Sequence, residues 1–158
     1  MLPQKSEKSN ILKIAAGSDH AGYLMKTQLV EFLKELGHEV IDCGTDSTES
    51  VDYPIYGQKV GHQVAEGFAE MGLCVCGTGI GISIAANKVK GVRAAVVHDC
   101  SSAILAREHN NANVICFGAR LIGDQTAKDS LKEFLDAEFL GGRHLRRIEE
   151  ISEMERYE

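Results

Sequence analysis

The sequence predicts an α/β fold in which helices cover both faces of a five-stranded parallel sheet. Five short apolar runs alternate with helix-length amphipathic stretches, and glycines stand where several of these elements end. The 158 residues are enough for one domain with a substantial core. Repeated β-α units of this kind build parallel sheets, because each right-handed crossover returns the chain to the same edge.

The first elements follow this pattern closely. Residues 11–17 form an apolar run ending in glycine, which indicates a strand, and residues 23–37 indicate a helix that Gly37 ends. The apolar face of that helix is predicted to comprise Leu24, Leu29, Phe32, Leu33 and Leu36. Residues 38–44 are predicted as the second strand and residues 45–54 as a loop.

The alternation continues to the end of the chain. A helix is predicted from Tyr56 to Met71, with Gly72 ending it. The later elements are a strand over 73–77, a helix from the glycine loop to residue 87, a strand over 92–98, a helix over 101–111, a strand over 113–118 and a helix over 123–140. The remainder, 141–158, indicates a charged C-terminal helical tail. We expect 11–158 to be one domain, preceded by a disordered or extended leader over 1–10.

Composition excludes several classes of protein. The net charge of −6 argues against nucleic-acid binding, no apolar run is long enough to span a membrane, and the polar N-terminus is no secretory signal. The odd number of cysteines favours reduced thiols in a cytoplasmic protein. Cys74 and Cys76 form a C-x-C on one strand face, which does not match a zinc site, so no metal is expected.

We expect the functional site at the loops that follow the strands, because parallel sheets bind ligands outside the carboxyl ends of their strands. The loop "CGTGIG" puts three alternate glycines between a strand and a helix, which favours an anion nest of backbone N–H groups. It does not match the dinucleotide fingerprint, since Ile82 or Ile84 stands where the last glycine belongs. A tight turn that only packs the helix on the strand is the alternative.

Cys76 directly precedes this loop. A thiol near a helix N-terminus readily forms a thiolate, so Cys76 is a candidate base, and the Thr78 hydroxyl can donate to an anion formed there. The alternative is a buried structural cysteine, which is the interpretation we adopt for Cys74 and Cys116.

Polar side chains elsewhere allow two readings. Asp19 and His20 follow the first strand, where they can cap a helix or bind substrate. His109 near a helix end is a cap or a general acid/base. The run "GGRHLRR" puts Arg143 and Arg147 on one helical face, as phosphate ligands or as a solvated surface.

Together these groups favour proton abstraction next to the carbonyl of a phosphorylated sugar. A thiolate base, a nest for the enediolate oxygen, a ring-opening histidine and distant arginines for phosphate complete such a site without a cofactor. A small-molecule sugar phosphate is therefore the expected ligand.

Several segments resemble the type B ribose-5-phosphate isomerases, the family that also holds galactose-6-phosphate isomerase subunits. These segments are "GSDHAG", "VIDCGT", "DYP", "CGTGIGISIAANKVKGVRAA", "REHNNANV", "FGAR" and "GGRH". The resemblance implies a Rossmann-like three-layer sandwich. It also implies a homodimer or dimer of dimers with the active site at the subunit interface, catalysing the interconversion of ribose 5-phosphate and ribulose 5-phosphate in the pentose phosphate pathway.

The resemblance also implies roles for individual residues. The catalytic residues are Cys76 as base, Thr78 and the ring-opening His109. The substrate-binding residues are Asp19, His20, Tyr53, Gly77, Gly79, Ile80, Gly81, Asn110, Arg120, Arg143 and Arg147, with His144 less secure. A subgroup carries a glutamate base where this chain has Ile80, so the cysteine mechanism is implied. No strand remains after the last helix to carry Arg143 and Arg147 to the ligand side, so we expect them to act at the partner's Cys76 loop.

Three other functions stay open from the sequence. The same chemistry can act on six-carbon galactose or allose 6-phosphate, since the motifs are shared. A phosphate- or nucleotide-binding module would bind without turnover. A thiol hydrolase would use Cys76 as a nucleophile and leave a covalent intermediate on it.

Overall fold

The computed structural model describes residues 11–157, which form one five-stranded sheet with the order β2-β1-β3-β5-β4. Every pairing in it is parallel. The strands are β1 (Lys13–Ser18), β2 (Glu39–Asp42), β3 (Met71–Cys76), β4 (Ala94–Val96) and β5 (Val114–Gly118). The predicted α/β fold is confirmed, whereas the predicted leader, 1–10, lies outside the described residues.

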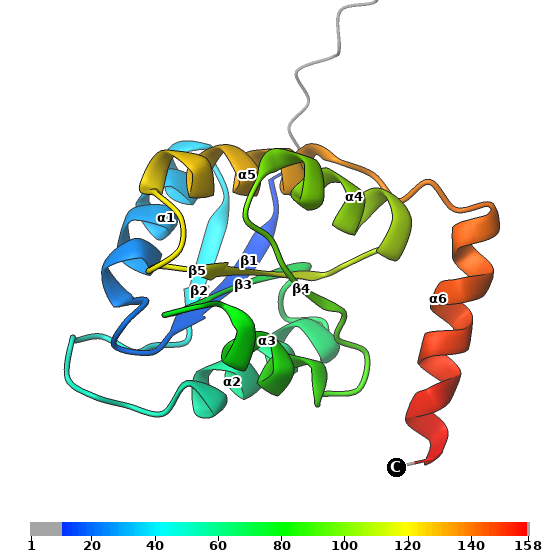
Figure 1. Ribbon diagram of the computed structural model, residues 1–158, viewed down its shortest axis with the longest axis horizontal. Helices are drawn as coiled ribbons and strands as arrows, with labels where there is room; N and C mark the ends of the chain where they lie inside the picture. The colour runs from blue at the N-terminus through cyan, green and yellow to red at the C-terminus, as the bar shows by residue number, and fades with distance from the viewer. Residues whose placement is uncertain (1–10, 158) are drawn as a thin grey trace, which may run out of the picture.

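The helices form a layer on each face of the sheet, with one helix apart from both (Figure 1). They are α1 (Tyr23–Glu35), α2 (Tyr53–Ala65), α3 (Ile80–Asn87), α4 (Cys100–Asn110), α5 (Asp124–Asp136) and α6 (Arg143–Met154), followed by the 3-10 turn η1 (Glu155–Tyr157). Helices α1, α4 and α5 pack on one face, and α2 and α3 on the other. Within residues 11–157, no helix has the length and apolar character needed to cross a membrane.

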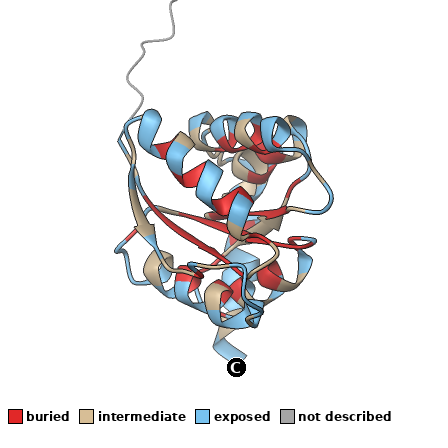
Figure 2. Cartoon of the chain, turned by 90° about the vertical axis from the view of Figure 1, so that its left-hand side faces the viewer, coloured by how far each residue is buried: buried red, intermediate tan, exposed pale blue. Residues whose placement is uncertain are grey.

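The core consists of two layers that the central strands separate (Figure 2). Side chains alternate along β3: Leu73 and Val75 join the layer under α1, α4 and α5, while Cys74 and Cys76 join the layer under α2 and α3. The predicted common face for Cys74 and Cys76 is therefore confirmed.

The boundaries of α2 correct the sequence-based prediction. The helix runs over Tyr53–Ala65, not from Tyr56 to Met71, and Pro54 lies in its first turn. Its end is set by Gly67, whose φ of +81° is left-handed and stops the helical path. Met71 and Gly72, which we expected at the helix end, belong to β3.

Other elements are shorter than predicted. Strand β4 has three residues, and just before its start the backbone N–H of Arg93 donates to the Asn113 side chain (2.7 Å). Helix α5 ends at Asp136, where the chain turns extended. In α1 the predicted apolar face is partly wrong, since Leu24 is 66% exposed and Met25 lies in the core instead.

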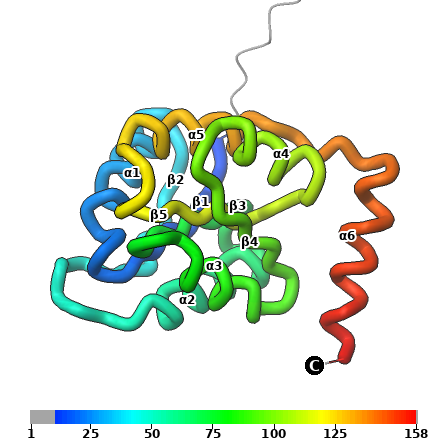
Figure 3. Tube along the Cα trace, viewed as in Figure 1, coloured from blue at the N-terminus to red at the C-terminus, as the bar shows by residue number. Residues whose placement is uncertain are grey.

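Helix α6 confirms the predicted helical tail and stands beside the body of the molecule (Figure 3). The turn η1 that follows it contacts the body through Glu155, whose carboxylate accepts from the N–H of Gly91 (2.9 Å). Ile148 is buried, but three apolar side chains of α6 are largely exposed on this one chain: Leu145, Ile151 and Met154. The helix thus presents apolar surface that its own subunit leaves open.

Candidate active site

The loops after β1 and β3 meet at the centre of the sheet, where the strand order reverses. The N–H of Asp19 donates to the carbonyl of Val75 (3.3 Å). A Cβ on Gly22 would stand 2.4 Å from the same oxygen, so only glycine allows this approach. The topology therefore brings the predicted "GSDHAG" and "CGTGIG" loops together at the expected ligand edge.

Cys76 is the last residue of β3, and its side chain is buried beneath the glycine loop. The N–H of Gly79 donates to its Sγ (3.1 Å). An N–H directed at sulfur stabilises negative charge there, so this contact suits a thiolate base. Thr78 is exposed and its Oγ1 accepts from the N–H of Ile80 (3.2 Å), which leaves the hydroxyl proton available for donation.

The loop conformation depends on close backbone contacts with the end of β5. Gly79 has a φ of +76°, and a Cβ there would lie 2.8 Å from the carbonyl carbon of Phe117. Gly118 faces Gly79, and a Cβ on Gly118 would lie 2.5 Å from the backbone carbonyl oxygen of Thr78. Helix α3 starts directly afterwards, and the first N–H groups of a helix have no intrahelical acceptor. The tight glycine turn between β3 and α3 is therefore present, but the Gly79 and Ile80 N–H groups are engaged inside the loop, and anion binding by the loop stays a prediction.

Asp19, His20 and Tyr53 surround this loop. The Asp19 carboxylate is buried and accepts from the N–H of Gly22 (3.0 Å), the residue before α1, and it does not cap that helix. His20 has its Nδ1 against the backbone of Val51, 3.1 Å from N and 3.2 Å from O, which directs Nε2 elsewhere. Tyr53 covers Gly81, where a Cβ would lie 2.5 Å from the ring carbon Cζ.

Arg120 brings positive charge to the same edge. Its N–H donates to the carbonyl of Gly77 (3.0 Å). Its guanidinium lies over that glycine, since a Cβ on Gly77 would stand 3.0 Å from Nη1. Ile80 is 51% exposed at the start of α3, on the rim of the loop.

His109 and Asn110 lie at the other edge of the sheet from Cys76. They end α4, which runs back from the carboxyl edge and leads into β5 at Val114. Cys76 pairs with Gly118 at the far end of β5, and that length of strand spans about 13 Å. Within one chain, the predicted base and the predicted ring-opening residue are therefore not brought together.

The predicted arginines of α6 belong to this second edge. The His144 ring stacks on the His109 ring, with centroids 4.3 Å apart and planes 13° from parallel. The pKa of His144 is lowered from its ordinary value, first by loss of hydration and then by the charges of His109, Arg143 and Arg147. The predicted site residues thus fall into two groups on this chain. We call them the Cys76 half-site, with Asp19, His20, Tyr53 and Arg120, and the His109 half-site, with Asn110, Arg143, His144 and Arg147.

Cys74 and Cys116 have the burial expected of structural cysteines. All five thiols are free. Burial raises the pKa of Cys43 to about 11. Cys74 and its strand neighbour Cys116 are fully buried, and their mutual hydrogen bond, with desolvation, raises the pKa of Cys74. Across residues 11–157, no three His, Cys, Asp or Glu side chains gather in a way that could hold a metal.

Comparison with known proteins shows the family of this chain. The model of the family described as Ribose/Galactose Isomerase matches residues 14–151. The chain belongs to the ribose/galactose isomerase family. The match spans both half-sites, from the residues before Asp19 to those after Arg147.

Individual members of the family are close to this chain over nearly their full length. Ribose-5-phosphate isomerase B of Escherichia coli is 48% identical over 90% of this chain and 96% of its own. D-erythrulose-4-phosphate isomerase of Pectobacterium atrosepticum is 42% identical over 94% and 98%. The structure of Clostridium thermocellum ribose-5-phosphate isomerase B superposes with a TM-score of 0.91 at 50% identity, covering 92% of this chain and 98% of its own.

Proposed function

We propose that this chain interconverts ribose 5-phosphate and ribulose 5-phosphate without a cofactor. The observation that carries the proposal is the Cys76 thiol, which receives the Gly79 N–H at the mouth of a glycine nest. Membership of the ribose/galactose isomerase family and the 48% identity to a ribose-5-phosphate isomerase B support the same reaction. A binding module without turnover has no use for a thiol at this point.

The chemistry follows from the groups around that thiol. The Cys76 thiolate takes the C2 proton of the open-chain aldose, and the electron pair moves onto O1 to give an enediolate. Loop N–H groups and the Thr78 hydroxyl stabilise the negative oxygen. The hydroxyl proton passes from O2 to O1, and the Cys76 thiol returns its proton to C1, which gives the ketose.

We propose further that each complete site combines the Cys76 half-site of one subunit with the His109 half-site of its partner. The opposite positions of Cys76 and His109 on the sheet support this arrangement, because one chain alone separates the base from the ring-opening group. The exposed apolar residues of α6 support a homodimer or a dimer of dimers. The five free thiols support a reducing, cytoplasmic setting.

A coupled assay with ribose 5-phosphate tests the reaction. Cys76→Ala should lower kcat by about 10²-fold or more, because a positioned base is lost. Exchange of the C2 proton with solvent should disappear in parallel. Cys43→Ala is the matched control, since that half-buried thiol follows β2, which β1 separates from β3, and it should retain both activities. Wild-type exchange in the Cys76 variant would refute the mechanism.

The preferred sugar length is tested in the same assay. Four-, five- and six-carbon aldose phosphates share the reacting C1 and C2 and differ in the distance to the phosphate. If the five-carbon sugar is the substrate, it should give the highest kcat/KM, because phosphate binding energy then positions the reacting carbon. A higher value for a four- or six-carbon sugar would reassign the substrate and keep the mechanism.

A further inference from the structure

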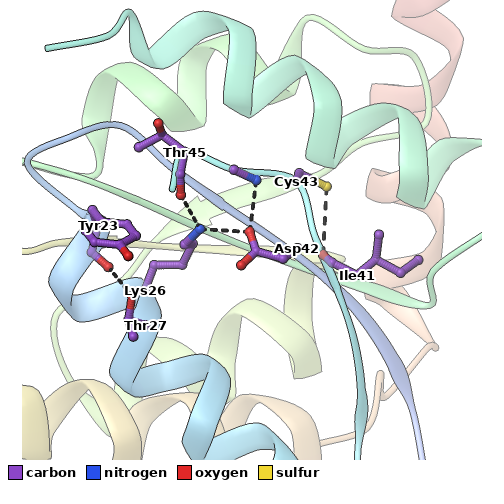
Figure 4. A network of polar contacts seen from close by, with 8 residues as sticks. Tyr23, Lys26, Thr27, Ile41, Asp42, Cys43 and Thr45 are labelled. Carbon is purple, nitrogen blue, oxygen red and sulfur yellow. Dashed lines mark hydrogen bonds and ion pairs between the residues drawn. The ribbon is translucent and has the colours of Figure 1, made fainter. Parts of the chain in front are cut away.

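Lys26 of α1 is a buried lysine outside both half-sites (Figure 4). It is 1% exposed, and its Nζ donates to the Asp42 carboxylate (2.8 Å) and to the backbone carbonyl of Thr45 (2.6 Å). The same Asp42 oxygen accepts from the N–H of Gly44 (2.9 Å). The ring of Tyr23 lies 5.6 Å from the ammonium. The ammonium therefore joins α1 to the first residues after β2.

These first residues open the β2–α2 loop, residues 43–52. Ser18 at the end of β1 makes two backbone hydrogen bonds to the start of this loop. Its N–H donates to the Gly44 carbonyl, and its own carbonyl accepts from the Thr45 N–H (2.8 Å each). The far end of the loop brings Val51 to His20 and leads into Tyr53. Between the two ends, the side of the loop that carries residues 48–50 is exposed. One loop thus connects the Lys26 contacts to two predicted substrate-binding residues.

Packing alone does not account for a lysine at this position. Removing an ammonium from water costs several kcal/mol, and apolar replacements of buried ion pairs are often neutral or stabilising. The Lys26 ammonium can do what an apolar side chain cannot. It donates to the buried carbonyl of Thr45 and to the Asp42 carboxylate, which in turn accepts from the N–H of Gly44. An apolar side chain would fill the space and leave the Thr45 oxygen without this donor.

We propose that Lys26 is a positioning residue for substrate binding, which acts by fixing the start of the β2–α2 loop and thereby the placement of His20 and Tyr53. The proposal rests on the proposed function for its kinetic consequence. Its structural consequence, the ordering of the loop, does not depend on which reaction the protein catalyses.

Lys26→Met tests the proposal with two measurements. Hydrogen exchange followed by mass spectrometry should show faster exchange in the peptide that holds the Thr45 and Val51 amides, with unchanged exchange in β3. The KM for ribose 5-phosphate should rise about tenfold with kcat within about threefold, as for loss of binding geometry away from the reacting atoms. A purely structural role would lower the folded fraction, and so kcat, without raising KM.

Two further variants keep the test decisive. Lys13→Met removes an exposed lysine of β1 that faces Glu39 at 3.7 Å, and it should leave both measurements at wild-type values. If Lys26→Met does not fold, Asp42→Ala cuts the same network from its half-exposed side and should speed loop exchange and raise KM. Wild-type loop exchange and wild-type KM in the folded variant overturn the proposal.

The two proposals can fail separately. If the protein does not turn over ribose 5-phosphate, loop exchange in Lys26→Met still decides the role of Lys26. If the reaction is confirmed and loop exchange in Lys26→Met stays at the wild-type rate, only the positioning role is refuted.

Discussion

Subunit mixing tests whether a complete site needs two chains. Cys76→Ala removes the base from one half-site, and Arg143→Ala removes a predicted phosphate ligand from the other. If the half-sites of two chains combine, every site in either homodimer carries one lesion, and each homodimer should lose most of its activity. The variants are denatured together in equal amounts, refolded, and assayed with ribose 5-phosphate.

The size of the recovery follows from the arrangement of the half-sites. Random reassortment makes about half of the dimers mixed, and an isologous dimer has two equivalent sites. In a mixed dimer, one site joins the mutated Cys76 half-site to the mutated His109 half-site, and the other site joins two intact ones. Half of the dimers are mixed, and half of the sites in each mixed dimer are intact. The mixture should therefore recover about a quarter of wild-type activity.

Two matched mixtures serve as controls. His109→Ala and Arg143→Ala lie in the same half-site, as the stacked rings of His109 and His144 indicate, so in a mixed dimer one site carries the first lesion and the other site carries the second. Each site then receives one altered His109 half-site, and no activity should return. Cys76→Ala mixed with His20→Ala should behave likewise. Recovery in a control mixture, or none in the Cys76 and Arg143 mixture, would refute the two-chain site.

Three further results are expected. His109→Ala should impair turnover of the cyclic sugar more than exchange on the open-chain form, and equal losses would remove its ring-opening role. Gly81→Ala should raise KM several-fold, because the new methyl must displace the Tyr53 ring; an unchanged KM would exclude Tyr53 from the site. Burial raises the pKa of Cys43 from 9.0 to about 11, so the unfolded chain releases this proton first, and the free energy of unfolding should fall as pH rises through that window. Denaturant titrations should show a shallower fall for Cys43→Ala, and an identical slope would contradict the assignment.

The fold could be predicted because its signals are local. Alternating apolar runs and amphipathic stretches are read within a few residues, and parallel crossovers leave little choice of topology. The error at α2 also has a local cause: Gly67 and Gly72 were both available as helix ends, and apolar residues continue between them. The structure uses Gly67, whose left-handed φ ends the helix and releases Met71 for pairing with Ile14.

The separation of Cys76 and His109 could also have been predicted from the sequence. A helix that follows a strand of a parallel sheet runs back, so its last residues lie at the amino edge of the sheet. The rule that assigns the Cys76 loop to the carboxyl edge therefore assigns His109, at the end of such a helix, to the opposite edge. Applied to both residues, the rule predicts that His109, like Arg143 and Arg147, acts in the site of a partner subunit.

The contacts that support the site could not be predicted in the same way, because they join segments distant in sequence. Nothing near Gly81 indicates that Tyr53 will lie against its Cα. Lys26 is intermediate between these cases. It stands three and four residues before the buried Leu29 and Val30, so helical periodicity directs it toward the core, although lysine is rarely buried. A charged residue on the apolar face of a helix signals a buried partner, and only the fold identifies the partners as Asp42 and the Thr45 carbonyl of the β2–α2 loop, whose Val51 contacts His20.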